Sequence, residues 1–474
     1  MAEVLEPDIC IIGGGSGGLS VAATAAQFGV DVVLLEKHKM GGDCLNYGCV
    51  PSKAMIAAGK RAQAMREASA FGIANVDPRI DPAGVHKHIH GVIAAIAPLD
   101  SVERFTGLGV RVIEEAGKFI DNRTVEAGGF LIRARRFVVA TGSAPGVPPI
   151  PGLDKVPHFT NETIFDNKKS LAHLMIIGGG PIGMELAQAH ARLGTKVTVL
   201  EAFTPLGKDD PELTAIILKQ LEAEGIEIRA GIRIERMERS RTGVRAVITE
   251  NENEKVIEAT HLLVAAGRQP NVEGLGLTDA GIEYDRKGIK VSRGLKTTNS
   301  RVYAIGDVAG GLQFTHVANY HAGIVIKNAL FRLPVRVDTS IVPWVTYTEP
   351  ELAHVGMTEE QAREKHKDIR VMRWPYAEND RAQAEHETQG LIKVITAKRG
   401  RILGATIVGE HAGELIALWA MAMSKKMKIG AVTSIVFAYP TLSEISKRAA
   451  YQFYAPGLTN PWIRRIIGWL RILG

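Results

Sequence analysis

Cys44 and Cys49 are the residues in this sequence whose spacing could carry redox chemistry. Four residues lie between them, and Gly48 and Pro51 permit the backbone to curl enough to close a small disulfide ring. A disulfide that is held close to an electron carrier can pass two electrons to a substrate through thiol exchange. The alternative is a pair of buried structural cysteines, which is the more frequent situation for an arbitrary pair in a cytosolic protein.

A nucleotide-binding unit stands directly before this pair. Apolar residues 9–12 predict a buried strand, residues 19–28 a helix, and residues 30–35 a second strand that ends at Glu36. The glycines of the intervening turn permit close approach of a pyrophosphate at the helix N-terminus, while the acid accepts a ribose hydroxyl. The residues expected to bind the dinucleotide are Gly13, Gly15, Gly18 and Glu36.

The same unit occurs a second time. A strand at 174–177 leads into a glycine turn, a helix through Leu193 and a strand at 196–200. Glu36 follows Gly13 by 23 residues, and Glu201 follows Gly178 by the same interval. We therefore expect two nucleotide domains of related architecture. The expected residues of the second site are Gly178, Gly180, Gly183 and Glu201.

Composition bounds the remaining possibilities. A chain of 474 residues with 46% hydrophobic and 23% charged residues predicts a globular protein of two to four domains. The net charge of +6 is mild, and the absence of a basic face with interleaved aromatic residues argues against nucleic-acid binding. Neither a secretion signal nor an uncharged apolar run of spanning length is present, so we expect a cytoplasmic protein.

The run GGDCLNYGCVPSK at residues 41–53 closely resembles the redox-active disulfide segment of the pyridine nucleotide–disulfide oxidoreductases. This family includes lipoamide dehydrogenase, glutathione reductase and mercuric reductase. The resemblance implies an α/β fold of the glutathione-reductase type, with two Rossmann-like domains and a C-terminal α+β dimerisation domain. It also implies a homodimer, with FAD in the first copy and a nicotinamide nucleotide in the second. The expected segments are 1–150 for FAD and disulfide, 151–270 for NAD, 271–339 for a return to the FAD domain, 340–454 for dimerisation, and 455–474 for a terminal helix.

The resemblance also implies a set of site residues. Cys49 would be the charge-transfer thiol nearest the flavin and Cys44 the interchange thiol that meets the substrate. Lys53 and Glu185 would pair beside flavin N5, where a lysine stabilises developing negative charge. Segments at 137–143, 262–268, 297–307 and 314–318 resemble further cofactor-binding parts of the family. The additional cofactor residues expected are Gly42, Thr141, Gly142, Gly267, Asp307 and Thr315.

Glu201 predicts the form of the nicotinamide. A carboxylate there accepts hydrogen bonds from a free ribose 2′-hydroxyl and repels a 2′-phosphate. The next residues, Ala202 to Thr204, supply no arginine for that phosphate. We therefore expect a preference for NADH over NADPH.

Tyr439 is a departure from the family pattern. Members that act on thiol substrates carry a His-Pro-Thr segment near the C-terminus, and the partner subunit supplies this histidine as the acid or base. Here the segment is Tyr-Pro-Thr, and Glu444 keeps the place of the glutamate that orients the histidine. Tyrosine, with an ordinary pKa of about 10, is a far poorer proton acceptor near neutral pH.

The sequence therefore favours an NADH-dependent reductase whose acceptor is not ordinary lipoamide, such as another thiol or disulfide, a metal ion or a quinone. A first alternative is a lipoamide dehydrogenase or mercuric-reductase-like enzyme in which Tyr439 has an altered role. A second alternative is a flavin redox sensor or docking protein with little turnover. The disulfide, Lys53 and Glu185 argue against this last reading, since a scaffold needs none of them.

The last fifteen residues form a second departure. Asn460 and Pro461 are typical of a helix start, and the following run predicts a cationic amphipathic helix. Its apolar face comprises Trp462, Ile463, Ile466, Ile467, Trp469, Leu470 and Leu473, and the opposite face Arg464, Arg465, Gly468 and Arg471. Such a helix is typical of an interfacial anchor on the inner membrane face, and the alternative is an extra helix packed on the dimer.

The three histidines at 86, 88 and 90 could suggest a metal site. His86 and His90 share one face of the expected helix, whereas His88 does not. Because no cysteine or carboxylate set accompanies them in the sequence, we expect no metal site.

Overall fold

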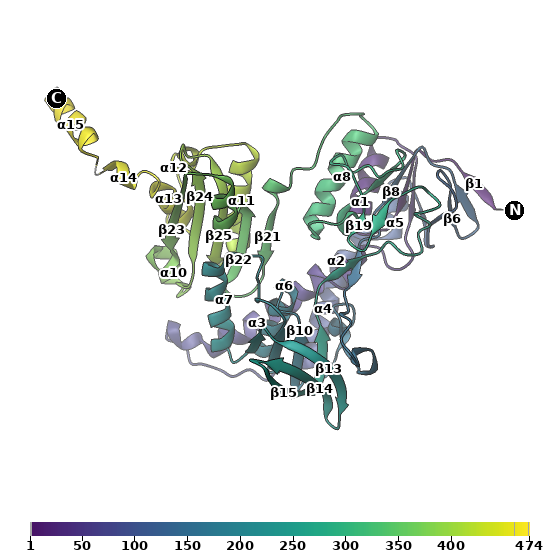
Figure 1. Ribbon diagram of the computed structural model, residues 1–474, viewed down its shortest axis with the longest axis horizontal. Coiled ribbons are helices and arrows are strands. Elements are labelled where there is room, and N and C mark those ends of the chain that lie inside the picture. The colour runs from purple at the N-terminus through teal and green to yellow at the C-terminus, as the bar shows by residue number, and fades with distance from the viewer. Residues whose placement is uncertain (1, 459, 473) are drawn as a thin grey trace.

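The computed structural model of the chain describes residues 2–458, 460–472 and 474. Figure 1 shows an elongated molecule whose N-terminal strands and C-terminal sheet lie at opposite ends, with the second nucleotide unit between and below them. The N-terminus and the C-terminal helix mark the two extremes.

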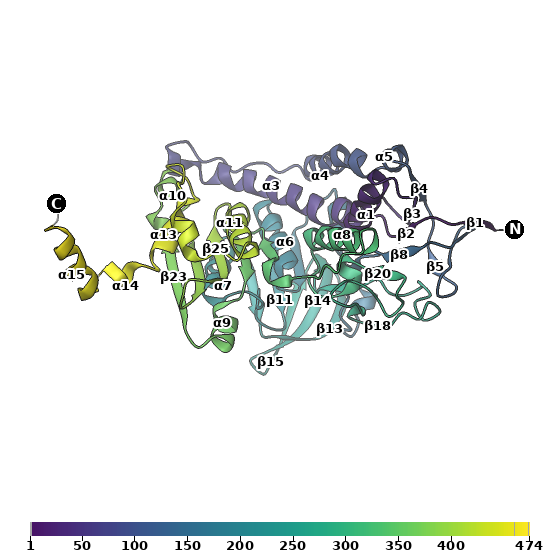
Figure 2. The ribbon, with the colours of Figure 1, turned by 90° about the horizontal axis from the view of Figure 1, so that it is seen from above.

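The first nucleotide unit is built on a parallel five-stranded sheet. Its strand order is β20 (Val302–Ala304), β8 (Arg136–Val139), β2 (Ile9–Ile12), β3 (Val32–Leu35) and β4 (Val110–Ile113). Alternate strand residues enter two different cores, as the period of two in a strand requires. Ile9, Ile11, Val32 and Leu34 pack with α1 (Ser16–Gln27) and α8 (Thr315–Ala329), which Figure 2 shows side by side.

Cys10 belongs to the opposite face of the same sheet. It is fully buried and packs with Ile12, Val33 and Leu35, so this third cysteine is a core residue. The core is closed by a smaller sheet of order β1 (Glu3–Leu5), β7 (Phe130–Ile132), β6 (Val125–Ala127) and β5 (Lys118–Phe119).

The expected strand at 30–35 begins two residues later in the structure, at Val32. The preceding helix ends at Gln27, and Gly29 adopts a left-handed φ of 72°. The amides of Gly29 and Val30 bond back to the carbonyls of Ala26 and Ala25, so residues 28–30 close the helix. The helix also starts earlier than expected, at Ser16, because the last glycines of the turn form its first turn.

Four α-helices lie between β3 and β4 in the chain. The redox segment lies on α2 (Gly42–Asn46) and the long α3 (Cys49–Arg66), and α4 (Pro82–Ile96) and α5 (Val102–Gly107) lie beyond them. Residues 72–81 between the short turn η1 (Ala68–Phe71) and α4 are not helical. Asp81 accepts a hydrogen bond from the amide of Ala83 and thereby begins α4 at Pro82.

The second unit repeats the first. Its parallel sheet has the order β12 (Glu227–Ala230), β11 (Lys196–Glu201), β10 (His173–Ile177) and β16 (His261–Val264), covered by α6 (Pro181–Arg192) and α7 (Pro211–Ala223). An antiparallel sheet of β13 (Arg233–Ser240), β14 (Gly243–Glu250) and β15 (Asn253–Ala259) is attached to it. Two short pairs, β9 (Ser143–Pro145) with β17 (Arg268–Pro270) and β18 (Tyr284–Asp285) with β19 (Gly288–Ile289), complete the connections.

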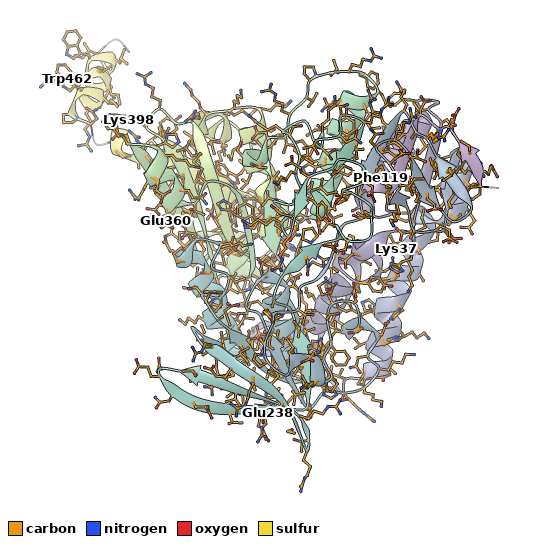
Figure 3. The ribbon with its side chains drawn as sticks, turned by 45° about the vertical axis from the view of Figure 1, so that its right-hand side comes forward. Lys37, Phe119, Glu238, Glu360, Lys398 and Trp462 are labelled. Atoms are coloured by element: carbon orange, nitrogen blue, oxygen red, sulfur yellow. The ribbon has the colours of Figure 1, made fainter. Side chains whose placement is uncertain are left out.

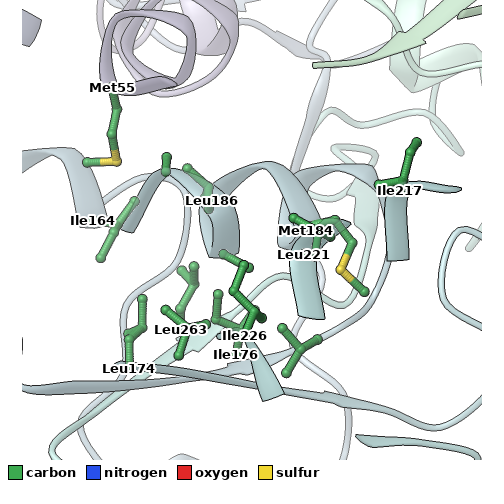
Figure 4. Packing of buried hydrophobic residues seen from close by; sticks show 14 of the residues in the cluster. Met55, Ile164, Leu174, Ile176, Met184, Leu186, Ile217, Leu221, Ile226 and Leu263 are labelled. Atoms are coloured by element: carbon green, nitrogen blue, oxygen red, sulfur yellow. The ribbon is translucent and has the colours of Figure 1, made fainter. Parts of the chain in front are cut away.

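The core of the second unit extends into the first. Met55 on α3 points toward α6, where it packs in one cluster with Leu186, Ile164 and Leu263 (Figure 4). This shared core fixes the position of α6 relative to the redox segment on α3.

The third unit is an antiparallel sheet. Its order is β21 (Pro343–Thr346), β22 (Glu351–Gly356), β25 (Ile402–Gly409), β24 (Leu391–Ala397) and β23 (Ile369–Pro375). Its helices are α9 (Glu359–Lys365), α10 (Asp380–Ala384), α11 (Ala412–Ser424), α12 (Ile429–Thr433) and α13 (Glu444–Tyr451). The domain boundaries expected from the sequence stay a prediction.

The C-terminal segment extends away from the body of the molecule. After α14 (Ala455–Leu458), α15 (Pro461–Leu470) begins at Asn460, whose side chain accepts a hydrogen bond from the amide of Trp462. Trp462 lies on the far side of α15 from the sheet in Figure 3, and Trp462 and Trp469 expose 69% and 75% of their surface. Leu473 of the expected apolar face lies outside the described residues.

Candidate functional site

The two fingerprint turns are so tight that only glycine fits them. Gly13 has a φ of 113°, and a Cβ there would lie 2.4 Å from the carbonyl oxygen of Ala140. Gly178 has a φ of 116° and would meet the carbonyl of Ala265 at the same distance. Both turns therefore bring their backbone against the end of a neighbouring strand, which leaves the helix N-terminus open to a phosphate.

The two acids occupy equivalent positions. Glu36 Oε2 accepts a hydrogen bond of 2.6 Å from the amide of Gly14, and Glu201 Oε2 accepts one from the amide of Gly179. Each carboxylate thus lies beside its own glycine turn, at the carboxyl end of the second strand. A ribose that follows a pyrophosphate along the turn would meet this carboxylate.

A cavity of about 1010 Å³ runs along the carboxyl edge of the first sheet. It connects Glu36 at one end with the cysteine pair and α6 at the other. Twelve of the residues expected from the sequence line it: Gly13, Gly15, Glu36, Gly42, Cys44, Cys49, Lys53, Thr141, Gly142, Glu185, Asp307 and Thr315. Gly18 lies behind the turn, where a Cβ would fall 1.9 Å from the carbonyl of Gly13.

These residues fit FAD. The cavity has at one end the glycine turn and carboxylate that suit an adenosine diphosphate, and at the other the carboxyl of Asp307 beside the thiols. Gly42 lies so close to Gly15 that a Cβ on Gly42 would be only 2.8 Å from the Cα of Gly15. The redox segment is therefore packed directly on the phosphate-binding turn.

Asp307 is held by a small network. Ser143 Oγ donates a hydrogen bond of 2.5 Å to Asp307 Oδ2, and Arg268 Nε lies 3.6 Å from the same oxygen. Burial raises the pKa of Asp307, although Ser143 and Arg268 oppose that rise. The turn that contains Thr141 and Gly142 is held by Asn271, whose side-chain amide donates a hydrogen bond of 2.9 Å to the carbonyl oxygen of Thr141.

The cysteine pair lies between two helices. Cys44 is on α2 and Cys49 is the first residue of α3, and both are thiols in this structure. The Sγ of Cys49 lies 3.5 Å from the hydroxyl of Thr315, the first residue of α8. The hydrogen bond from the Cys44 thiol lowers the pKa of Cys49 to about 6; burial opposes this, while Thr315 and Lys53 support it. The same hydrogen bond, together with burial, raises the pKa of Cys44.

Lys53 and Glu185 form an ion pair of 2.8 Å in the cavity. Burial disfavours the charge on Lys53, but the carboxylate of Glu185 outweighs that effect and raises the pKa of the lysine. Tyr347 completes the arrangement, because its amide donates to Glu185 Oε1 at 2.9 Å and its ring lies 4.2 Å from Lys53 Nζ. The fold thus brings together Lys53 and Glu185, which are 132 residues apart in the sequence.

Sequence reasoning missed Arg268 and Tyr347 as site residues. Arg268 bridges three parts of the chain, since it contacts Asp43 of the redox segment at 3.1 Å as well as Ser143 and Asp307. Its position directly after Gly267, in the turn that follows β16, was a usable signal, because Ser143 occupies the equivalent place after Gly142 in the first unit.

The glycines and the acid of the second fingerprint do not line this cavity. Pro181, Ile182 and Glu185 on α6 reach it, whereas Gly178 and Glu201 stand at the carboxyl ends of β10 and β11. The other expected residues of this site that do not line the cavity are Gly180, Gly183 and Gly267. A nicotinamide nucleotide bound along that edge would therefore approach the cavity over α6.

Tyr439 and Glu444 are not brought to the cysteines of the same chain. Neither lines the cavity. Tyr439 is 70% exposed in the loop before α13 and donates a hydrogen bond of 2.8 Å from Oη to Asp380 Oδ2. This bond raises the pKa of Tyr439, so the residue is an even poorer proton acceptor than a free tyrosine.

The part of the chain that the structure describes contains no helix long and apolar enough to cross a membrane.

Two family models match the chain. The model described as pyridine nucleotide-disulphide oxidoreductase matches residues 7–322, and the model of the dimerisation domain of the same family matches residues 342–450. The second match supports a homodimer.

Curated relatives and solved structures agree with these matches. The chain is 35% identical over 449 residues to a mercuric reductase of Lysinibacillus sphaericus, covering 94% of this chain and 82% of the relative. It is 34% identical over 461 residues to a dihydrolipoyl dehydrogenase of Geobacillus stearothermophilus, covering 94% and 96%. The Cu(II) complex of the HOCl-induced flavoprotein disulfide reductase RclA from Escherichia coli superposes with a TM-score of 0.84 at 30% identity, covering 93% and 98%.

Proposed function

Because the chain belongs to the pyridine nucleotide-disulphide oxidoreductase family, we propose that it is an NADH-dependent reductase whose acceptor is not ordinary lipoamide. The bound FAD supplies the relay of two electrons between the nicotinamide and the cysteine pair. The chain itself binds both nucleotides, holds the thiols and sets which acceptor can react with them.

The preference for NADH rests on Glu201. Its carboxylate lies at the glycine turn of the second unit, where it accepts bonds from the amides of Gly179 and Phe203. A 2′-phosphate placed there would be repelled, and Ala202 to Thr204 offer no arginine to bind it.

The two cysteines have different tasks. Cys49 lies beside Thr315 and Lys53, which stabilise a thiolate, so it is the thiol that interacts with the flavin. Cys44 keeps its proton more strongly and is the thiol that exchanges with the acceptor. Lys53, oriented by Glu185, places positive charge in the cavity where negative charge develops during the reaction.

The proposed choice of acceptor rests on the presence of tyrosine at position 439. Reduction of a disulfide acceptor needs a group that gives a proton to the departing thiolate, and the reverse oxidation of a dithiol needs a group that removes one. Tyr439 does neither efficiently near neutral pH. An acceptor that receives electrons without this proton transfer is suitable. Thiophilic metal ions are of this kind, and the similarity to mercuric reductases favours them as a second, more specific candidate.

An acceptor screen tests this proposal. NADH oxidation by the FAD-loaded dimer is measured with lipoamide, glutathione disulfide, mercuric and cupric ions, and a quinone. We expect at least one of the other acceptors to be reduced faster than lipoamide, with the activity lost in Cys44→Ser. Fastest turnover with lipoamide would instead support the dihydrolipoyl dehydrogenase alternative, and the absence of turnover with every acceptor the redox-sensor alternative.

The exposed C-terminal helix supports a second contact of the enzyme, with an anionic membrane surface. Six apolar side chains of α15 are exposed: Trp462, Ile463, Ile466, Ile467, Trp469 and Leu470. Three arginines stand in the same segment, and residues 455–474 contain no acidic residue. Burial of the apolar face in the lipid interface and about 1 kcal/mol from each arginine near the surface would combine to hold the enzyme there.

A further inference from the structure

The fold brings a carboxylate to the histidine pair on α4. Asp166 ends a short helical turn, η4 (Ile164–Asp166), which precedes the second unit and lies 76 residues from His90 in the sequence. The expectation that no carboxylate accompanies the histidines was wrong, because the separation along the chain concealed the contact. Among the described residues, the ligand atoms of His86, His90 and Asp166 all lie within 4.8 Å of one another.

The geometry of these side chains suits a metal ion. His86 and His90 are one helical turn apart, and their ring centroids are separated by 4.1 Å. The Nε2 atom of His90 lies 3.2 Å from Asp166 Oδ1. Two ligands of one tetrahedral zinc ion are about 3.3 Å apart, since each zinc–ligand bond is about 2.0–2.1 Å. Small rotations of His86 and Asp166 would therefore complete the set.

A buried atom without a partner points to the same position. The Nε2 atom of His90 is shielded from solvent and makes no hydrogen bond among the described residues, although the Asp166 carboxylate is near. A buried polar atom without a partner is costly, and a cation between the two groups would remove that cost.

Both sides of the cluster are held in place by the protein core. Ile89 on α4 and Ile164 and Phe165 on η4 are buried in the same hydrophobic cluster. The ligands thus stand on elements that are already packed together. The side chain of Asp166 is still 67% exposed and that of His90 38% exposed, which leaves a path by which an ion can enter.

A second group of ionisable side chains is not suited to a metal ion. Glu349, Glu387 and Glu410 also lie within ligand distance of one another, but Lys60 Nζ bonds to Glu349 at 2.7 Å and to Glu410 at 2.6 Å. The ammonium group already occupies the place of a cation.

We propose that His86, His90 and Asp166 bind one divalent transition-metal ion of the zinc class and thereby tie α4 of the first nucleotide unit to the turn that leads into the second. Two imidazoles and a carboxylate are ligands that zinc accepts, with water in the fourth position. The neighbouring Phe165 lines the cofactor cavity, so the ion would also fix one wall of that cavity.

The test is zinc binding by isothermal titration to the FAD-loaded dimer without a histidine tag. The cysteines must not compete, so the titration uses Cys44→Ser/Cys49→Ser as the background. We expect one Zn²⁺ per chain in this background, with a rise in thermal midpoint, and no response to Mg²⁺. His86→Ala, His90→Ala and Asp166→Asn should each weaken binding by at least about 100-fold.

His88→Ala is the matched control. His88 stands on the same helix but on its exposed side, away from the cluster, so its removal should leave zinc affinity unchanged. Equal loss in His88→Ala, unchanged affinity in His86→Ala, or no zinc binding at millimolar concentration would each overturn the proposal. Folding of the variants is checked by FAD content and circular dichroism.

Discussion

At the scale of single residues, the site is organised around the thiolate of Cys49. The hydrogen bond from Cys44 contributes most to its low pKa, followed among the favourable effects by the hydroxyl of Thr315 and the charge of Lys53. An ordinary cysteine has a pKa of about 8.5, so Cys49 is ionised at neutral pH while most thiols are not.

A pH titration of the two-electron-reduced enzyme tests this pKa. Because the pKa of Cys49 is lowered to about 6, the thiolate is present above that pH and is protonated as the pH falls through it. We expect the long-wavelength charge-transfer absorbance to be full at pH 8, to fall to half near pH 6 and to be lost about two pH units below that. Thr315→Val should move the midpoint upward and Thr315→Ser should not. A midpoint between 8 and 9 in the wild-type enzyme would contradict the assignment.

The second prediction at this scale concerns the nucleotide preference that Glu201 sets. The kcat/KM of NADH should exceed that of NADPH, and Glu201→Ala should narrow the difference because it removes the repulsion of a 2′-phosphate. Glu36→Ala is not a suitable comparison, since it alters the FAD site. A wild-type enzyme that prefers NADPH would refute this role of Glu201.

Tyr439 gives the third prediction. Tyr439→His should raise the oxidation of dihydrolipoamide, by up to about 10²–10⁴-fold if the imidazole reaches the partner's thiols, without changing flavin reduction by NADH. Tyr439→Phe is the control, because it keeps the ring and removes only the hydroxyl that bonds to Asp380. Rapid dihydrolipoamide oxidation by the wild-type enzyme would show that no histidine is needed.

At the scale of elements, the sequence predicted those parts whose signals are local. The strand, glycine turn and helix of each nucleotide unit were predictable because Gly13 and Gly178 need a backbone that other residues cannot adopt. Cys49 and Lys53 both stand on α3, where residues at i and i+4 share a face. Helix ends were less accurate, as the return of residues 28–30 onto α1 shows.

Contacts between distant elements could not be predicted in the same way. Arg268 joins the redox segment to the first sheet, and Asp166 meets His90 through tertiary packing alone. Neither pair has a spacing that marks it in the sequence. The pairing of Lys53 with Glu185 was expected only because family resemblance supplied it.

The fourth prediction concerns α15 as an element. The full-length dimer should float with vesicles that contain anionic lipid, and a chain ending at residue 459 should not. The thermal midpoints of the two proteins should be similar, because α15 is exposed throughout its length. Equal flotation, together with a lower midpoint after truncation, would show instead that the helix packs on the partner subunit.

At the scale of the whole molecule, all three units contribute to one cavity. The first sheet provides its floor, α6 of the second unit contributes Glu185, and Tyr347, which follows β21 of the third unit, closes on Lys53. Figures 1 and 2 show the third unit far from the N-terminal strands, with the redox segment and α6 between them. Tyr439 lies within the residues that match the family's dimerisation domain.

The proposed function requires electrons from NADH to reach the pair formed by Cys44 and Cys49. The most direct measurement is alkylation of the air-oxidised, FAD-loaded dimer before and after anaerobic addition of one equivalent of NADH, with denaturation in the alkylating agent and mass spectrometry of the peptides. Cys10, a buried core thiol, should be labelled in both samples and serves as the internal reference. We predict that Cys44 and Cys49 are labelled only after NADH. Reduction of the flavin by NADH while both residues stay unlabelled would contradict the account.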